Sequence, residues 1–126
     1  MRQFRDLRVW QKAHQHVLEV YRESASFPRE DQFGLTSQLR RAAVSIPCNI
    51  AEGSKRIYPN DFGRFLNYAE GPCGETDCLF LLSADLGFMK PERSRELITS
   101  VQEISKMLCA LRERVVGAPK EWTMDR

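Results

Sequence analysis

One stretch of the chain, from Leu35 to Arg56, constrains the fold more than any other. Its apolar side chains recur every three or four residues, which is the spacing of a helix that buries one stripe. These positions are Leu35, Leu39, Ala42, Ala43, Ile46 and Ile50. Pro47 lies inside the pattern, where a proline removes a backbone hydrogen bond and costs about 3 kcal/mol. Because the apolar rhythm continues through Ile50, the sequence predicts one helix with a kink at Pro47.

Three other segments show helical spacing. The first starts near Asp6, a potential cap, and ends at residues 24–28; its apolar positions are Leu7, Trp10, Ala13, Val17, Leu18 and Tyr21. The third starts at Asn60 or Asp61 and ends at Gly87, with a bend or a short break expected at residues 71–74. Its expected buried face is Phe62, Phe65, Leu66, Ala69, Cys73, Leu79, Leu82 and Leu86. The last begins with Pro91 in its first turn and ends at residues 117–119.

Four amphipathic helices with short connectors predict an all-α fold, an antiparallel up-and-down four-helix bundle. The connector of residues 28–34 could hold a single helical turn, and Gly53 is expected either to cap the second helix or to be a hinge before residues 54–56. The 126 residues fit one domain spanning 1–126, with residues 116–126, including Trp122, as a loosely held tail. No apolar run reaches the roughly 18 residues of a membrane span. The charged N-terminal segment lacks the apolar core of a secretory signal, so we expect a cytoplasmic protein.

The sequence lacks the spacing of the common catalytic and metal sites. His14 and His16 lie two positions apart and have no glutamate three residues before them, so we expect one half-buried and one exposed histidine. The four cysteines, at positions 48, 73, 78 and 109, form no CxxC pair and are expected to be buried, reduced thiols. We therefore predict a protein that is not an enzyme and that needs no cofactor and no metal.

Three polar residues have two possible interpretations. Asn49 and Glu52 follow Pro47 beside the apolar stripe, and Glu75 has a similar place in the third helix. In the first interpretation they are structural, and they bond backbone groups freed by Pro47 or pair with an arginine. In the second, Glu52 belongs to a functional site. The first is favoured.

Basic residues suggest one candidate surface. Residues 1–60 hold 10 Lys and Arg against 6 Asp and Glu, whereas residues 61–126 hold 9 against 11. Arg40, Arg41, Lys55 and Arg56 are either a solvated helix face or a phosphate-binding patch. Adjacent helical residues point about 100° apart, so we expect one arginine to contact Glu75 or Glu52, within its own subunit or in a neighbouring one, while the other faces solvent.

Several motifs recur in one known family. They are Leu7-x-Val9-Trp10-Gln11-x-Ala13, then Phe27-Pro28, then Gly34-Leu35-x-x-Gln38-x-Arg40-Arg41-Ala42-Ala43-x-Ser45-Ile46-Pro47-x-Asn49-Ile50-Ala51-Glu52-Gly53. Phe65-Leu66, Ala69, Gly71, Glu75 and Leu86-Gly87 follow in register. In this combination the chain resembles the bacterial four-helix bundle proteins called S23 or intervening-sequence proteins, which are encoded in insertions within 23S ribosomal RNA genes and elsewhere. Cys48 departs mildly from the family pattern, and residues 72–74 put the straightness of the third helix in doubt.

The resemblance implies a homopentameric ring. It also implies a likeness to the accessory protein of diversity-generating retroelements, a basic pentamer that binds nucleic acid and a reverse transcriptase. Aromatic residues outside the core stripe, Phe4, Phe33 and Tyr58, independently predict a sticky surface that a closed oligomer would hide. Two hypotheses remain open: a ring that binds RNA or another nucleic acid through its repeated basic patch, or a protein-interaction scaffold that binds no nucleic acid. The sequence names neither the RNA nor a partner protein.

Overall fold

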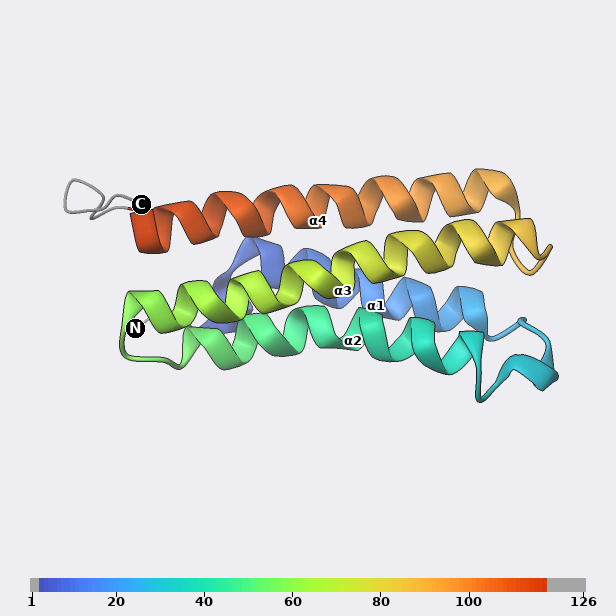
Figure 1. The fold of residues 1–126 in the computed structure, drawn as a ribbon, viewed down its shortest axis with the longest axis horizontal. Coiled ribbons are helices and arrows are strands. Elements are labelled where there is room, and N and C mark those ends of the chain that lie inside the picture. The colour runs from blue at the N-terminus through green and yellow to red at the C-terminus, as the bar shows by residue number, and fades with distance from the viewer. Residues whose placement is uncertain (1–2, 118–126) are drawn as a thin grey trace.

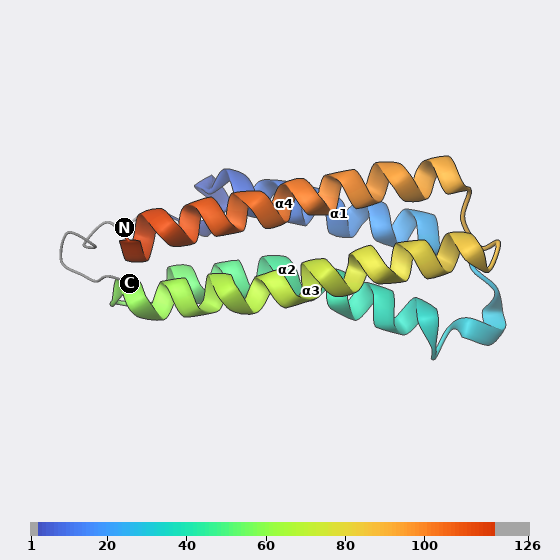
Figure 2. The same cartoon turned by 45° about the horizontal axis from the view of Figure 1, so that its top comes forward.

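Four α-helices form the body of this computed structural model, which describes residues 3–117 (Figure 1). They are α1 (Arg8–Ser24), α2 (Leu35–Ser54), α3 (Pro59–Asp85) and α4 (Pro91–Gly117). Short 3₁₀ turns, η1 (Phe4–Asp6) and η2 (Arg29–Asp31), precede α1 and α2. Successive helices run in opposite directions; α1 and α3 each pack against α2 and α4, and so lie diagonally opposite (Figures 1 and 2). The described residues contain no strand, and the predicted antiparallel four-helix bundle is confirmed.

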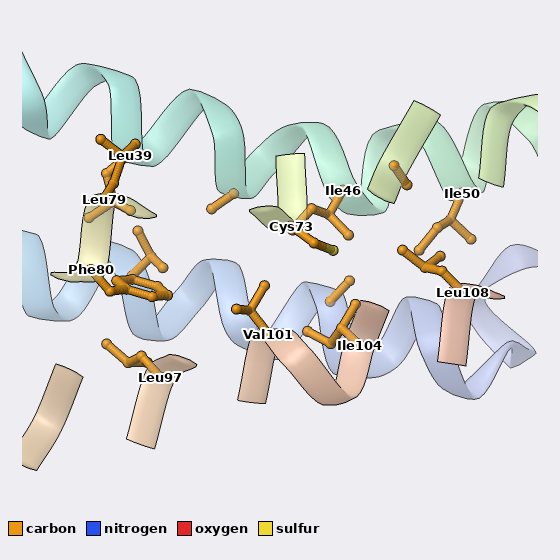
Figure 3. Packing of buried hydrophobic residues seen from close by; sticks show 14 of the residues in the cluster. Leu39, Ile46, Ile50, Cys73, Leu79, Phe80, Leu97, Val101, Ile104 and Leu108 are labelled. Carbon is orange, nitrogen blue, oxygen red and sulfur yellow. The ribbon is translucent and has the colours of Figure 1, made fainter. Parts of the chain in front are cut away.

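The core runs the full length of the bundle. Side chains from all four helices fill it, and Figure 3 shows them following one another from Leu39 and Phe80 at one end to Ile50 and Leu108 at the other. The fully buried apolar residues of α2 fall on the predicted stripe, and those of α4 are Leu97, Val101, Ile104 and Leu108. None of the described helices is both long enough and apolar enough to cross a membrane.

Helix α2 continues through Pro47 to Ser54, as predicted, and the kink at this position stays a prediction. The single turn expected in the preceding connector is η2. Gly53 does not cap the helix; it lies inside α2, where an added Cβ would be 2.6 Å from the Cβ of Phe65. This glycine therefore lets α2 and α3 approach each other closely.

The predicted face of α1 is rotated from the observed one. Its buried residues are Val9, Ala13, His16, Val20 and Ser24, whereas Leu18 and Tyr21 are 39% and 44% exposed. The predicted cap is also wrong, because Asp6 ends η1 and Leu7 precedes α1 without a side-chain cap. Trp10 stays half-buried because Phe4 of η1 packs against it, with ring centroids 5.1 Å apart. His16 is fully buried rather than half-buried, and His14 is exposed.

Helix α3 is continuous, so a break at residues 71–74 is excluded, whereas a bend there stays a prediction. It starts at Pro59 rather than behind an Asn60 or Asp61 cap. Beyond residue 74 its buried side includes Thr76, Leu79, Phe80 and Ser83, while Leu82 and Leu86 are exposed. The two buried hydroxyls donate to backbone oxygens of α3 itself, at 3.0 Å for Thr76 and 2.7 Å for Ser83. The packing of α3 against both α2 and α4 outweighs the low helix propensity of its glycine and proline residues at positions 71–74.

The end of α3 and the start of α4 follow the prediction. Gly87 has a φ of 80°, its N–H donates to the oxygen of Ala84, and the N–H of Phe88 donates to that of Ser83. This pair of bonds is the Schellman arrangement, which favours glycine. Pro91 is the first residue of α4, and Gly117 is its last. The predictions for the tail beyond Gly117, including Trp122, lie outside the described residues.

Candidate nucleic-acid interface

Arg40 and Arg41 point in different directions, as their spacing requires. The Arg40 Nε donates to the Oγ of Ser24 at 2.8 Å, and its guanidinium carbon lies 4.4 Å from the ring centroid of Tyr21. A second guanidinium nitrogen donates to the Tyr21 carbonyl at 3.4 Å. A cation placed on the last carbonyls of a helix stabilises that helix. Arg40 therefore closes the C-terminal end of α1. Among the described residues no ion pair joins it to Glu75 or Glu52, and a contact with either residue of another subunit stays a prediction.

Arg41 is exposed on α2 and forms no ion pair within residues 3–117. It lines a shallow groove between α2 and α3 with Gln38, Ser45, Pro72 and Glu75. Glu75 is exposed in the same groove, and no ion pair joins it to Arg41. The groove thus presents one cation and one anion to solvent side by side.

Lys55 and Arg56 follow the end of α2 and are both exposed. Arg56 contacts Glu52 at 3.2 Å, and its guanidinium carbon lies 4.6 Å from the ring centroid of Phe65. Lys55 forms no ion pair with any described residue. Arg41 and Lys55 are 14 positions apart, so at the α-helical rise their backbones are separated by roughly 20 Å. The four predicted basic residues therefore form no compact patch.

Asn49 and Glu52 do not bond the backbone freed by Pro47. The Asn49 amide donates to the carbonyl and to the hydroxyl of Ser45, at 2.9 and 3.0 Å. Glu52 is exposed and pairs with Arg56, which is an exposed pair of the kind worth little to stability. Removing the Glu52 carboxylate should therefore change the free energy of unfolding little.

A second groove, between α3 and α4, escaped the sequence analysis. It is lined by Asn60, Gly63, Arg64, Asn67, Arg112, Glu113, Val116 and Gly117. Arg112 donates to Glu70 at 3.0 Å, which raises the pKa of its guanidinium, and Arg64 pairs with Asp61. These arginines belong to the half of the chain with excess acid, so charge counting did not single them out.

Exposed apolar side chains stand beside the basic residues. Ile57 and Tyr58, in the connector between α2 and α3, are 87% and 67% exposed. Phe33 is also exposed, whereas Phe4 packs on Trp10. Two of the three aromatic residues predicted to lie outside the core are thus on the surface.

The remaining reactive side chains form no catalytic cluster within the described residues. Burial, and secondly the charge of Arg93, lowers the pKa of His16 to about 4, and burial raises the pKa of Cys73 to about 12. Cys48 and Cys78 are exposed and Cys109 is half-buried, so the prediction of buried thiols holds only for Cys73. Residues 3–117 hold no group of three His, Cys, Asp or Glu side chains that could bind a metal.

Comparison with known proteins identifies the family. The family model described as 23S rRNA-intervening sequence protein matches residues 5–110. A crystal structure of a protein with unknown function from the S23 ribosomal protein family of Bacteroides thetaiotaomicron VPI-5482 has the same fold, with a TM-score of 0.75 and 22% identity. That match covers 83% of this chain and 98% of the other. No protein with a curated description matches. With the family model matching most of its length, the chain belongs to the 23S rRNA-intervening sequence protein family.

Proposed function

We propose that this protein is a non-enzymatic, ring-forming bundle, a homopentamer, that binds RNA or another nucleic acid through exposed basic residues. One observation carries the proposal: Arg41 and Lys55 are exposed on α2 and just after its end, and form no ion pair within the described residues. A cation without a protein partner can neutralise a phosphate and release a counterion. Arg56 contributes less because it already contacts Glu52, and Arg40 is committed to α1. The four free cysteines fit the reducing cytoplasm in which we place the protein.

The family description refers to the intervening sequences of 23S ribosomal RNA genes that encode such proteins, and it names no ligand. Two positively charged residues on one bundle bind RNA weakly. Repetition around a ring raises the effective concentration of the second and later contacts without any new chemistry. The proposed pentamer therefore explains how so sparse a patch could retain RNA.

The exposed leucines support a ring. Leu81, Leu82 and Leu86 are 44% to 54% exposed at the end of α3, and Leu18 is 39% exposed on α1, which lies diagonally across the bundle. Exposed apolar side chains at two different places on one subunit suit head-to-tail contacts between subunits. Such contacts form a closed ring when the rotation from one subunit to the next divides a full turn evenly. Light scattering after gel filtration should give a mass near five times 14.6 kDa. A monodisperse monomer would remove the ring from the proposal.

The RNA test compares two double charge reversals. Arg41→Glu with Lys55→Glu should weaken RNA binding several-fold and flatten the salt dependence, by ~0.7 in the log–log slope for each phosphate of a single strand that is no longer neutralised. Arg95→Glu with Lys106→Glu makes the same change of charge at exposed positions of α4 and should have a smaller effect. Fluorescence anisotropy at several salt concentrations measures both.

Equal effects of the two variants would mean that overall charge alone drives binding. If the variant with Arg41→Glu and Lys55→Glu forms a folded oligomer and keeps the wild-type RNA affinity and salt dependence, the RNA-binding surface lies elsewhere. If the wild-type ring retains no RNA at low salt, the protein-interaction scaffold replaces the proposal, and a co-purifying protein would then identify the partner.

A further inference from the structure

The end of the bundle where α2 meets α3 combines exposed apolar side chains, one of them aromatic, with cations. In four consecutive residues it presents Lys55, Arg56, Ile57 and Tyr58, all of them exposed. The last two are 87% and 67% exposed, so two large side chains with apolar surface lie next to each other in water. Folding of the single chain gains nothing from leaving them in water. Their position is therefore better explained by something that contacts them.

The groove between α3 and α4 begins beside this connector. Asn60, which lines the groove, is two residues beyond Tyr58, and Arg64 and Asn67 follow on α3. Side-chain amides both donate and accept hydrogen bonds, and a guanidinium contacts phosphate in a fork. The groove is not purely cationic, because Asp61 pairs with Arg64 and Glu113 is part of the lining. Such a mixed lining suits the edges of bases and sugars as well as phosphates.

These features suit a single strand better than a duplex. In an A-form duplex the bases are stacked on one another, and a protein meets mainly phosphates and 2′-hydroxyls. A single strand offers free base faces, and aromatic side chains on a basic surface stack against them with little sequence preference. The charge at this end is modest, since Arg56 and Arg64 are each paired with a carboxylate. Stacking would therefore supply a large share of the affinity.

We propose that this end of the bundle binds a single-stranded nucleic-acid segment, in which Tyr58 stacks against an unpaired base and Lys55 contacts the backbone phosphate. The groove beside Asn60 and Arg64 receives the adjacent nucleotide. This inference rests on the proposed function and narrows it, because it names the form of nucleic acid that is bound. It also adds a site that the basic residues of α2 alone did not indicate.

The test uses two probes, a labelled oligouridine and an RNA duplex of equal length, measured by anisotropy with the full oligomer. Tyr58→Ala should weaken oligouridine binding roughly tenfold and leave duplex binding unchanged. Tyr58→Phe keeps the ring and should retain most of the affinity. Tyr68→Ala is the matched control, because Tyr68 is 51% exposed on α3 but lies outside the connector and the groove lining.

The outcomes separate this inference from the proposed function. Wild-type protein that binds the duplex as tightly as oligouridine, with no effect of Tyr58→Ala, overturns the single-strand site and leaves RNA binding standing. Failure of the wild type to bind either probe overturns both. A smaller oligomer for Tyr58→Ala, seen by light scattering, assigns the Tyr58 side chain to a contact between copies of the chain and also overturns the site.

Discussion

His16 gives the fold a defined sensitivity to acid. The side chain is 1% exposed, its ring lies edge-on to Phe80 at 5.6 Å, and neither ring nitrogen has a hydrogen-bond partner among the described residues. Burial lowers its pKa to about 4, and the charge of Arg93 adds to this. In the unfolded chain a histidine has a pKa of about 6.5. Between these two values the unfolded state binds a proton that the folded state does not, so stability falls as the pH falls.

The size of the effect follows from the same two pKa values. Each pH unit in the window lowers the free energy of unfolding by up to about 1.4 kcal/mol, and the total approaches about 3 kcal/mol near pH 4. Small domains are stable by only about 5–15 kcal/mol, so this loss is large. Replacing His16 with leucine removes the titrating group. It also removes two buried nitrogens without partners, so His16→Leu should be at least as stable as wild type at neutral pH.

Urea unfolding at a fixed protein concentration, between about pH 7 and pH 5, measures the difference between the two proteins. Carboxylates titrate in both and cancel in that difference. The stability advantage of His16→Leu should therefore grow steadily as the pH falls. His14→Leu is the control, because it makes the same replacement at an exposed histidine and leaves His16 in place. It should show none of the pH-dependent advantage of His16→Leu. Parallel profiles for wild type and His16→Leu would refute the reasoning.

Two other substitutions test the packing. Gly53→Ala should lower the free energy of unfolding by ~1–3 kcal/mol, because its Cβ would overlap Phe65. A Cβ added at Gly74 would have no atom within 4 Å apart from the backbone of its own helix, so Gly74→Ala should instead raise the free energy of unfolding by up to ~1 kcal/mol. Equal losses at both positions would contradict the close approach of α2 and α3. Arg40→Ala should cost ~1–2 kcal/mol in thermal unfolding without changing RNA affinity, and weaker RNA binding at full stability would contradict its structural role.

The four helices could be predicted because each has apolar residues at helical spacing along its length. Which face of a helix is buried could not be predicted for α1 and for the second half of α3. In α1 two neighbouring stripes compete, one with Trp10 and Tyr21 and one with Val9, Ala13 and Val20. The second is buried although its residues are smaller and include His16. In α3 the hydroxyls of Thr76 and Ser83 bond their own helix and so enter the core at little cost. A hydropathy pattern scores such residues as exposed.

The functional surface was harder to predict, because a cation is available to a polyanion only if no other side chain holds it. Arg40 is held by residues 16 and 19 positions earlier in the chain. Arg93 contacts Glu23 across 70 positions, and Arg112 contacts Glu70 across 42. These pairs cross between helices, so no local pattern shows them. Counting charged residues in each half of the sequence therefore includes arginines that are already paired, such as Arg40, and gives no sign of the arginines that line the groove between α3 and α4. Of the four predicted basic residues, Arg41 and Lys55 are the two that are exposed and form no ion pair within residues 3–117.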